Sequence, residues 1–155
     1  MTVVNEIKKE SCKKFADESP CICFNVRKAS KVITSVYENM FKDLGITAPQ
    51  ATIINSALTL GPLTVNELAE AVATDRTTLT RNLKIMEREG LIRITAGADK
   101  RVKEINCAPK GIELADKMRG LFTEFKGKVD KHIGEERMQA LCKELCEVVT
   151  KIQNI

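Results

Sequence analysis

Hydroxyl-bearing and cationic side chains crowd one segment of the chain, whose sequence over residues 78–93 is TLTRNLKIMEREGLIR. Arginine, lysine and threonine can donate hydrogen bonds to phosphate oxygens and to base edges in the major groove of DNA, which is wide enough to admit a helix. Leu79, Leu83 and Met86 recur at helical spacing in the same segment. The pattern predicts a helix that is buried along one side and cationic along the other.

The residues of this helix that could contact DNA have hydroxyl or cationic side chains. They are Arg76, Thr77, Thr78, Thr80, Arg81 and Lys84. The N-terminal half of such a helix is the part that lies deepest in the groove. An amphipathic helix with a solvated charged face has the same pattern, so the neighbouring segments must decide between the two interpretations.

The segment before this helix has the features of a second, shorter helix. Thr64 with Glu67 three residues later forms a capping box, and the helix that it starts is expected to end near Ala73. Thr74 or Asp75 can then cap the helix described above. Two helices separated by only a few residues predict a helix-turn-helix.

After Gly90 the periodicity changes. Residues 91–95 and 102–106 are rich in β-branched side chains and flank a polar turn over residues 96–101. Two strands that directly follow the second helix favour a winged helix-turn-helix, a mostly α fold with a small β-hairpin wing.

The tip of the predicted hairpin carries a carboxylate and two cations. Asp99 precedes Arg101 by two residues and could hold its guanidinium in one orientation for insertion into a minor groove, while Lys100 would contact phosphate. An Asp-x-Arg sequence in a turn is by itself more often a solvated loop. Its position at the expected wing tip favours a second contact with DNA.

The net charge of +4 is concentrated in this region. Residues 75–103 hold eight basic and four acidic side chains, so this segment alone has a net charge of +4 and the other residues sum to zero. A cationic patch of this kind is the electrostatic signature of a nucleic-acid-binding surface.

Composition limits the other classes of function. A chain of 155 residues with 43% hydrophobic residues can form one globular domain, or a small domain with an extended interaction element. The opening MTVVNEIKKESCKK has charges where an export signal needs an apolar run, and no segment has the roughly 20 apolar residues of a membrane span. We therefore expect a cytoplasmic protein that does not bind membranes.

The six cysteines have no spacing that is typical of a metal site. They are Cys12, Cys21, Cys23, Cys107, Cys142 and Cys146, and none belongs to a Cys-x-x-Cys pair. With His132 as the only histidine, we expect neither a metal site nor a cofactor. A disulfide framework is not expected in a cytoplasmic protein.

Long helices are predicted on both sides of the winged segment. Ser19 is expected to cap a helix that has Pro20 at its first position and ends at Gly45. A second helix should follow from Thr47 to Leu60. Apolar residues at helical spacing in the first of these helices are Ala29, Ile33, Val36, Tyr37, Met40 and Leu44.

Two narrow apolar seams follow after Pro109, where the next helix should start. One comprises Ile112, Ala115, Met118, Phe122, Phe125, Val129 and Ile133, and the other Met138, Leu141, Leu145, Val148, Ile152 and Ile155. A hairpin turning at Gly134 within one chain would explain them, but we favour pairing between two chains, because a winged domain does not need two more long helices for its core.

These elements predict three segments. Residues 1–45 form an N-terminal dimerisation segment with a long helix, residues 46–107 the DNA-binding lobe, and residues 108–155 the C-terminal dimerisation helices.

From about Pro20 to the C-terminus the chain resembles the MarR family of winged helix-turn-helix regulators. The resemblance rests on LTVNELAEAV, on DRTTLTRNLKIMEREGLI and on the DKR of the wing, in the order and spacing of that family. It implies an obligate homodimer with residues 76–84 in the major groove and Arg101, supported by Asp99, in the minor groove. The family usually has Leu-Thr ahead of the next helix, where this chain has Cys107-Ala108-Pro109.

Residues 21–50 look like the thiol-based organic-hydroperoxide sensors within that family. Cys23, followed by Phe24, falls at their reactive cysteine, and Tyr37 at one of their tyrosines. Two further tyrosine positions of that subgroup hold Arg27 and Ala48.

The residues themselves allow two interpretations of this cysteine pair. Cys21 and Cys23 are expected in the first turn of a helix, with Arg27 one turn on, and a helix N-terminus and nearby cations lower a thiol pKa. A bridge between the two cysteines would have to unwind that turn. The alternative is that they are small buried side chains beside a dimer interface, as Cys142 and Cys146 could also be.

The favoured function is a homodimeric DNA-binding transcriptional regulator, a repressor bound to a pseudopalindromic operator. A small-molecule effector or cysteine oxidation would release it, with Cys21, Cys23, Phe24, Tyr37 and Met40 as candidate sensor or ligand residues. Two alternatives are a thiol oxidoreductase that uses Cys21 and Cys23, and a winged-helix protein-interaction module without DNA binding.

Overall fold

The structure is a computed structural model that describes residues 13–14, 18–97 and 99–154. Most of the charged opening segment, Cys12, Ala98 of the wing turn and Ile155 of the C-terminal seam lie outside the described residues. The chain divides into two compact units, Met1–Ala48 and Pro49–Ile155.

The main element of the first unit is helix α2, Ile22–Phe41, which continues into the 3₁₀ helix η1, Lys42–Leu44, and ends at Gly45 with φ of 70°. The expected end at Gly45 is confirmed. The backbone there has the left-handed conformation, which glycine adopts without steric cost.

The expected start at Ser19 is wrong, since Cys21 is the N-cap and Pro20 precedes the helix. The side-chain amide of Asn25 explains the later start. It donates to the carbonyl oxygens of Ser19 (2.7 Å) and Cys21 (3.1 Å) and so holds the segment before the helix in a non-helical conformation.

Helix α3, Ala48–Leu60, matches the predicted second helix. Its first backbone N–H, that of Ala48, donates to Glu38 Oε1 at 3.0 Å. A side chain of α2 therefore satisfies one of the N-terminal donors that a helix leaves without an internal partner.

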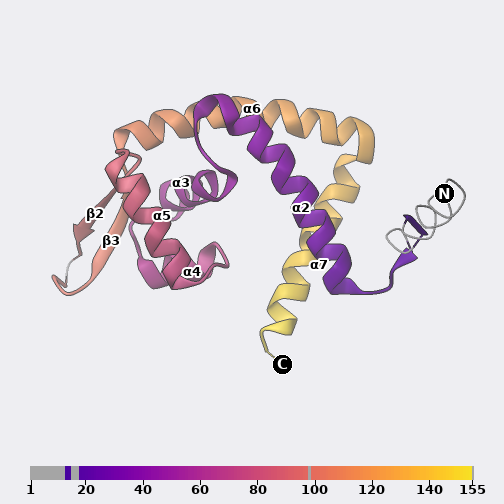
Figure 1. Cartoon of the computed structure of the whole chain (residues 1–155), viewed down its shortest axis with the longest axis horizontal. Coiled ribbons are helices and arrows are strands. Elements are labelled where there is room, and N and C mark those ends of the chain that lie inside the picture. The colour runs from indigo at the N-terminus through magenta and orange to yellow at the C-terminus, as the bar shows by residue number, and fades with distance from the viewer. Residues whose placement is uncertain (1–12, 15–17, 98, 155) are drawn as a thin grey trace, which may run out of the picture. The chain divides into compact units, whose positions relative to one another are not determined.

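The second unit holds the predicted winged helix-turn-helix (Figure 1). Strand β1, Leu63–Thr64, leads into helices α4, Val65–Ala71, and α5, Arg76–Arg88, which are followed by strands β2, Ile92–Ala96, and β3, Lys103–Cys107. The fold class expected from the sequence is confirmed.

The capping box that starts α4 is present in both directions. Thr64 Oγ1 accepts from Glu67 N–H at 3.2 Å, and Glu67 Oε2 accepts from Thr64 N–H at 2.8 Å. These bonds hold the pKa of Glu67 below its ordinary value.

The three strands form an antiparallel sheet in the order β1-β3-β2. Ile94 pairs with Ile105, and on the other side of β3 Leu63 also pairs with Ile105. The sequence did not predict β1, because two residues are too short to show a strand period. β2 is an edge strand of this sheet, so one of its sides has no strand partner among the described residues.

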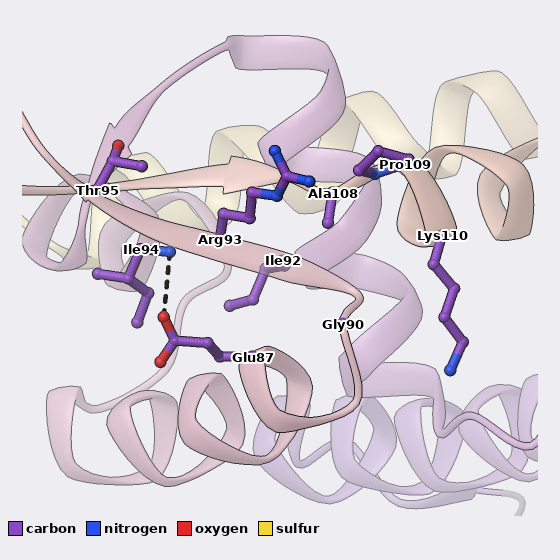
Figure 2. Close-up of a pocket in the computed structure, with 9 residues that line it drawn as sticks. All are labelled: Glu87, Gly90, Ile92, Arg93, Ile94, Thr95, Ala108, Pro109 and Lys110. Carbon is purple, nitrogen blue, oxygen red and sulfur yellow. Dashed lines mark hydrogen bonds between the residues drawn. The ribbon is translucent and has the colours of Figure 1, made fainter.

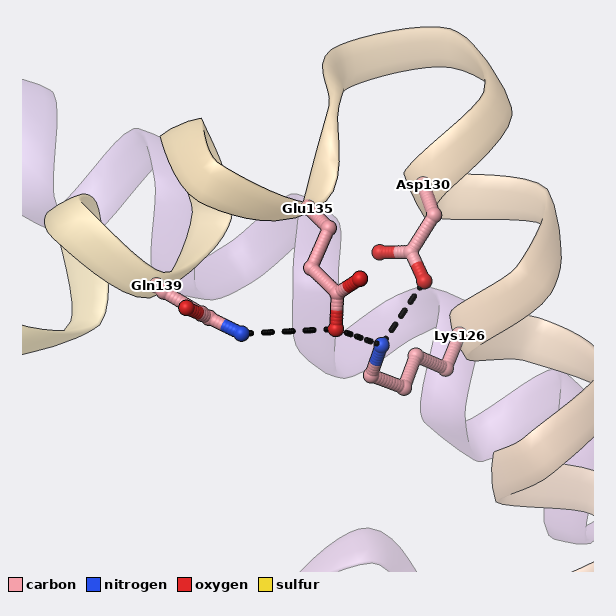
Figure 3. A network of polar contacts seen from close by, with 4 residues as sticks. All are labelled: Lys126, Asp130, Glu135 and Gln139. Atoms are coloured by element: carbon pink, nitrogen blue, oxygen red, sulfur yellow. Dashed lines mark hydrogen bonds and ion pairs between the residues drawn. The ribbon is translucent and has the colours of Figure 1, made fainter.

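Helices α6, Pro109–Ile133, and α7, Glu135–Ile152, meet at a turn at Gly134, whose φ is 96°. None of the described residues of α7 is buried, so the structure does not show the apolar seam of α7 packed within one chain, which was the alternative to pairing between two chains. A cluster of polar contacts joins the two helices near this turn (Figure 3). The ammonium group of Lys126 bonds to Asp130 and to Glu135, both at 2.8 Å, and Gln139 also donates to Glu135. None of the helices that the structure describes is long and apolar enough to cross a membrane.

Candidate nucleic-acid interface

Helix α5 is held in the second unit by its apolar side. Leu79, Leu83 and Met86 are all buried, as predicted. Asp75, not Thr74, is the N-cap, and its carboxylate accepts from the backbone N–H of Thr78 at 2.8 Å. Bonds to Thr78 favour the ionised form of this cap and hold the pKa of Asp75 below its ordinary value.

The predicted DNA-contacting residues of α5 lie mainly on its solvent-exposed side. Arg76, Thr77, Thr78, Arg81 and Lys84 are exposed. The structure thus leaves the three predicted cations of this helix accessible to a polyanion, while its opposite side is anchored in the core.

Thr80 differs from the other predicted residues of this helix. Its side chain is half-buried, and its hydroxyl donates to the backbone carbonyl of Arg76 at 2.7 Å. The hydroxyl proton of Thr80 is therefore used inside the helix, and the oxygen remains as an acceptor for a base or a water molecule.

The wing tip differs from the expectation in the role of Asp99. Its Oδ1 accepts from the backbone N–H of Arg101 at 2.9 Å, and no ion pair between the two side chains occurs among the described residues. An Asp at the start of a turn commonly bonds to a backbone N–H two residues later. Asp99 therefore shapes the turn, and the side chains of Lys100 and Arg101 remain exposed.

One exposed arginine extends this cationic surface beyond the residues selected from the sequence. Arg88 follows Lys84 by four residues, which places it on the same side of α5, and the helical spacing from Arg81 to Lys84 and Arg88 was a sufficient signal for it. Arg93 is also exposed, but its side chain lies on the side of β2 opposite to Ile94 and Glu87 (Figure 2), so it is not part of the surface of α5.

Polar contacts join the C-terminal end of α5 to the wing and to α6. Glu87 Oε1 accepts from the backbone N–H of Ile94 at 3.3 Å, and Lys110 Nζ donates to the backbone carbonyl of Glu89 at 2.9 Å. The Leu91 carbonyl accepts from Ala108 N–H at 3.1 Å.

An open groove of about 630 Å³ lies at this junction (Figure 2). Its lining residues come from the end of α5, from β2 and from the start of α6. They are Glu87, Gly90, Ile92, Arg93, Ile94, Thr95, Ala108, Pro109 and Lys110.

The candidate sensor cysteines lie at the start of α2. Cys23 is in the first helical turn and is exposed, but Cys21 is the N-cap and precedes the turn in which we expected it. Cys142 and Cys146 are exposed on α7, whereas Cys107 is partly buried and its pKa is raised by burial. Within the described residues no group of three potential metal ligands occurs.

The other candidate ligand residues, Phe24, Tyr37 and Met40, are half-buried on α2. Tyr37 packs near Phe41, with ring centroids 6.0 Å apart. Phe24 precedes Tyr37 by thirteen residues, which is about 20 Å along a helix. One subunit therefore does not bring Phe24 together with the other two.

This arrangement of a capped two-helix unit followed by a hairpin defines a winged helix-turn-helix protein. The MarR family model matches residues 46–103, which cover the segment from α3 through α5 and β2 and end at the first residue of β3. The chain is 29% identical over 135 residues to the HTH-type transcriptional regulator SarZ of Staphylococcus epidermidis, covering 84% of this chain and 87% of SarZ.

Two further comparisons extend over most of the chain. The organic hydroperoxide resistance transcriptional regulator of Bacillus subtilis is 31% identical over 119 residues, covering 76% of this chain and 80% of the relative. The crystal structure of the M. tuberculosis transcriptional regulator MosR in complex with DNA has 30% identity and a TM-score of 0.72, covering 85% of this chain and 98% of MosR. The chain belongs to the MarR family of transcriptional regulators, which favours a regulator over a thiol oxidoreductase.

Proposed function

We propose that this protein is a homodimeric repressor that binds a pseudopalindromic DNA operator. The observation that carries the proposal is the exposed cationic side of α5, which comprises Arg76, Arg81 and Lys84 and is followed by an exposed cationic wing tip. The similarity to MosR, whose structure was solved with DNA, supports the same partner. Residues 76–84 would enter the major groove, and Arg101 would enter the adjacent minor groove.

Exposed apolar side chains on α7 support the dimer. This helix has no buried residue among those described, and Leu141, Leu145, Val149 and Ile152 are between 41% and 57% exposed. Helical spacing places these four side chains on one side of α7. A second subunit would cover this side, and two copies of α5 could then contact successive half-sites about one helical turn of DNA apart.

DNA binding is tested with sequences selected from random DNA, followed by titrations of the selected site. Arg81→Ala should weaken binding and relax base preference, and Arg101→Ala should weaken it with a smaller dependence on salt. Lys143→Ala is the matched control, because it removes one exposed cation from α7 outside the proposed surface. If both arginine variants bind like the control, these roles are wrong.

The dimer is tested by sedimentation equilibrium. Leu145→Asp places a carboxylate on the apolar side of α7 and should produce monomers that no longer bind the operator tightly. Lys143→Asp introduces the same side chain on the other side of the helix, so it should remain dimeric. A wild-type protein that sediments as a monomer would contradict the proposal.

Release of the operator is proposed to follow oxidation of Cys23, whose thiol is exposed in the first turn of α2. The thiolate sulfur would attack the outer oxygen of an organic hydroperoxide, the O–O bond would break, and sulfenic acid and an alcohol would form after the alkoxide takes one proton. Each cysteine would react once, so no turnover is expected.

The similarity to the B. subtilis organic hydroperoxide resistance regulator supports this route. Operator binding after addition of an alkyl hydroperoxide should fall in wild type and persist in Cys23→Ser, with Cys142→Ser as the matched control that still responds. A small-molecule effector near Tyr37 and Met40 is the second route of release. If a small molecule abolishes operator binding by the Cys23→Ser variant, the result would favour this second route.

A further inference from the structure

The side chain of Glu87 forms a hydrogen bond between the recognition helix α5 and the wing, in addition to the short segment of chain that links them. Glu87 in the last turn of α5 accepts a hydrogen bond from the backbone N–H of Ile94, at the centre of β2, with a distance of 3.3 Å (Figure 2). The linker between the two elements contains Gly90 with φ of 74°. Glu87 is an acidic residue in a cationic segment, and a direct contact with DNA does not explain its presence.

The position of Ile94 in the sheet explains why its N–H is available to a side chain. Gly97 N–H donates to Val102 at 2.8 Å, and the Leu91 carbonyl accepts from Ala108 at 3.1 Å, so these odd-numbered residues direct their polar groups toward the β3 side. Successive residues of an antiparallel strand alternate in direction. The N–H of Ile94 therefore points to the open edge of β2, where no strand of the described chain lies.

We propose that Glu87 is a positioning residue that fixes the wing at a defined angle to the recognition helix, so that both contact DNA as one rigid surface. The inference rests on the proposed DNA-binding function. Gly97, where the last bond between the two wing strands lies, is three residues beyond Ile94, which is about 10 Å along an extended chain. A rotation of about 8° at Ile94 would displace this end of the wing by about 1.4 Å, which is enough to break a hydrogen bond to a phosphate or base.

If Glu87 acted only through its negative charge, its removal would strengthen DNA binding, whereas loss of a positioning residue would weaken it. Removing a carboxylate near a polyanion should strengthen DNA binding, whatever the carboxylate touches. Glu87→Gln removes the charge but keeps an oxygen acceptor for Ile94 N–H, whereas Glu87→Ala removes both. Glu87→Asp keeps the charge but shortens the side chain. The three variants together separate the hydrogen bond from the charge.

The test is a set of double-mutant cycles with Arg101→Ala, measured as operator affinity by fluorescence anisotropy. We expect Arg101→Ala to weaken binding about tenfold in wild type and in Glu87→Gln, but only about threefold or less in Glu87→Ala and Glu87→Asp, where the wing is already displaced. Arg81→Ala should have the same effect in all four backgrounds. Glu89→Ala is the control, because it removes an exposed carboxylate two residues away from the same segment.

Amide hydrogen exchange gives a second measurement on the folded variants. Ile94 N–H should exchange faster in Glu87→Ala and Glu87→Asp than in wild type, and Glu87→Gln should stay closer to wild type. An Arg101→Ala effect of the same size in every Glu87 background would overturn the role of Glu87 while leaving the DNA-binding proposal intact. Failure of the wild-type protein to select any DNA sequence would overturn both.

Discussion

The close approach between α6 and the linker before β2 allows a quantitative prediction for Gly111. A Cβ added at this glycine would lie 2.2 Å from the backbone oxygen of Leu91 and 2.9 Å from Cys107 Sγ. The first distance is at least about 1 Å too short for a carbon–oxygen contact. The oxygen cannot move freely, since it belongs to the backbone and accepts the hydrogen bond from Ala108 N–H.

Two terms of opposite sign determine the stability of Gly111→Ala. Alanine favours a helix over glycine by about 1 kcal/mol. Overpacking costs about 1–3 kcal/mol, and weakening the bond to the Leu91 carbonyl costs about 1 kcal/mol more. The net effect should be a loss of about 2 kcal/mol in the free energy of unfolding, measured by urea denaturation at a fixed protein concentration.

Two other glycines of α6 are matched controls for this prediction. A Cβ at Gly120 or Gly127 would meet no atom within 4 Å. Gly120 follows Gly111 by nine residues, which places it on the opposite side of the helix at about 100° per residue. Gly120→Ala and Gly127→Ala should each stabilise the protein by up to about 1 kcal/mol. Equal or greater stability of Gly111→Ala than of these controls would refute the argument from close packing.

Three more predictions concern exposed contacts. Thr64→Ala should lower the free energy of unfolding by about 1 kcal/mol by removing the cap of α4, whereas Thr59→Ala, in the exposed part of α3, should have little effect in the same urea titration. The pKa of Asp75 in the folded state is lowered from 3.8. The ionised cap therefore stabilises the fold fully above the unfolded-state pKa, and this contribution is lost as pH falls through the folded-state pKa. Melting temperatures from pH 3 to 7 should show wild type losing stability relative to Asp75→Asn only at the acidic end, and a constant difference would contradict this. Lys126→Met should lower the melting temperature in dilute buffer, and the difference should shrink in 1 M salt because the ion pairs are exposed; an effect that salt does not change would mean that the contacts are not electrostatic.

The sequence predicted best those features that depend on neighbouring residues. The capping box of Thr64 and Glu67, the buried stripe of α5 and the turn at Gly134 each involve residues within one or two turns of each other. Their physical causes act before tertiary structure forms, so the sequence contains them directly. The exposed side of α5 follows from the buried one, because helical geometry leaves no other place for these cations.

The missed or misplaced features depend either on a distant strand or on which of several nearby partners a polar side chain selects. β1 exists only because it pairs with β3, and two residues carry no period that would indicate a strand. Helix α2 starts later than Ser19 because the Asn25 side chain occupies the carbonyls before it. The bond of Asp99 was assigned to the wrong partner, since an Asp-x-Arg sequence does not distinguish the guanidinium from the backbone N–H.

The two proposed DNA contacts are held in place by interactions of different strength. Burial of Leu79, Leu83 and Met86 contributes about 1.5–3 kcal/mol per side chain to the attachment of α5. The bond between Glu87 and Ile94 is an exposed hydrogen bond, which contributes about 1 kcal/mol at most. A change that weakens DNA binding through the wing therefore costs less folding free energy than one that moves the recognition helix. Variants at Glu87 or at the exposed wing tip should accordingly lose operator affinity at nearly full stability, because these side chains are not part of the core that carries α5.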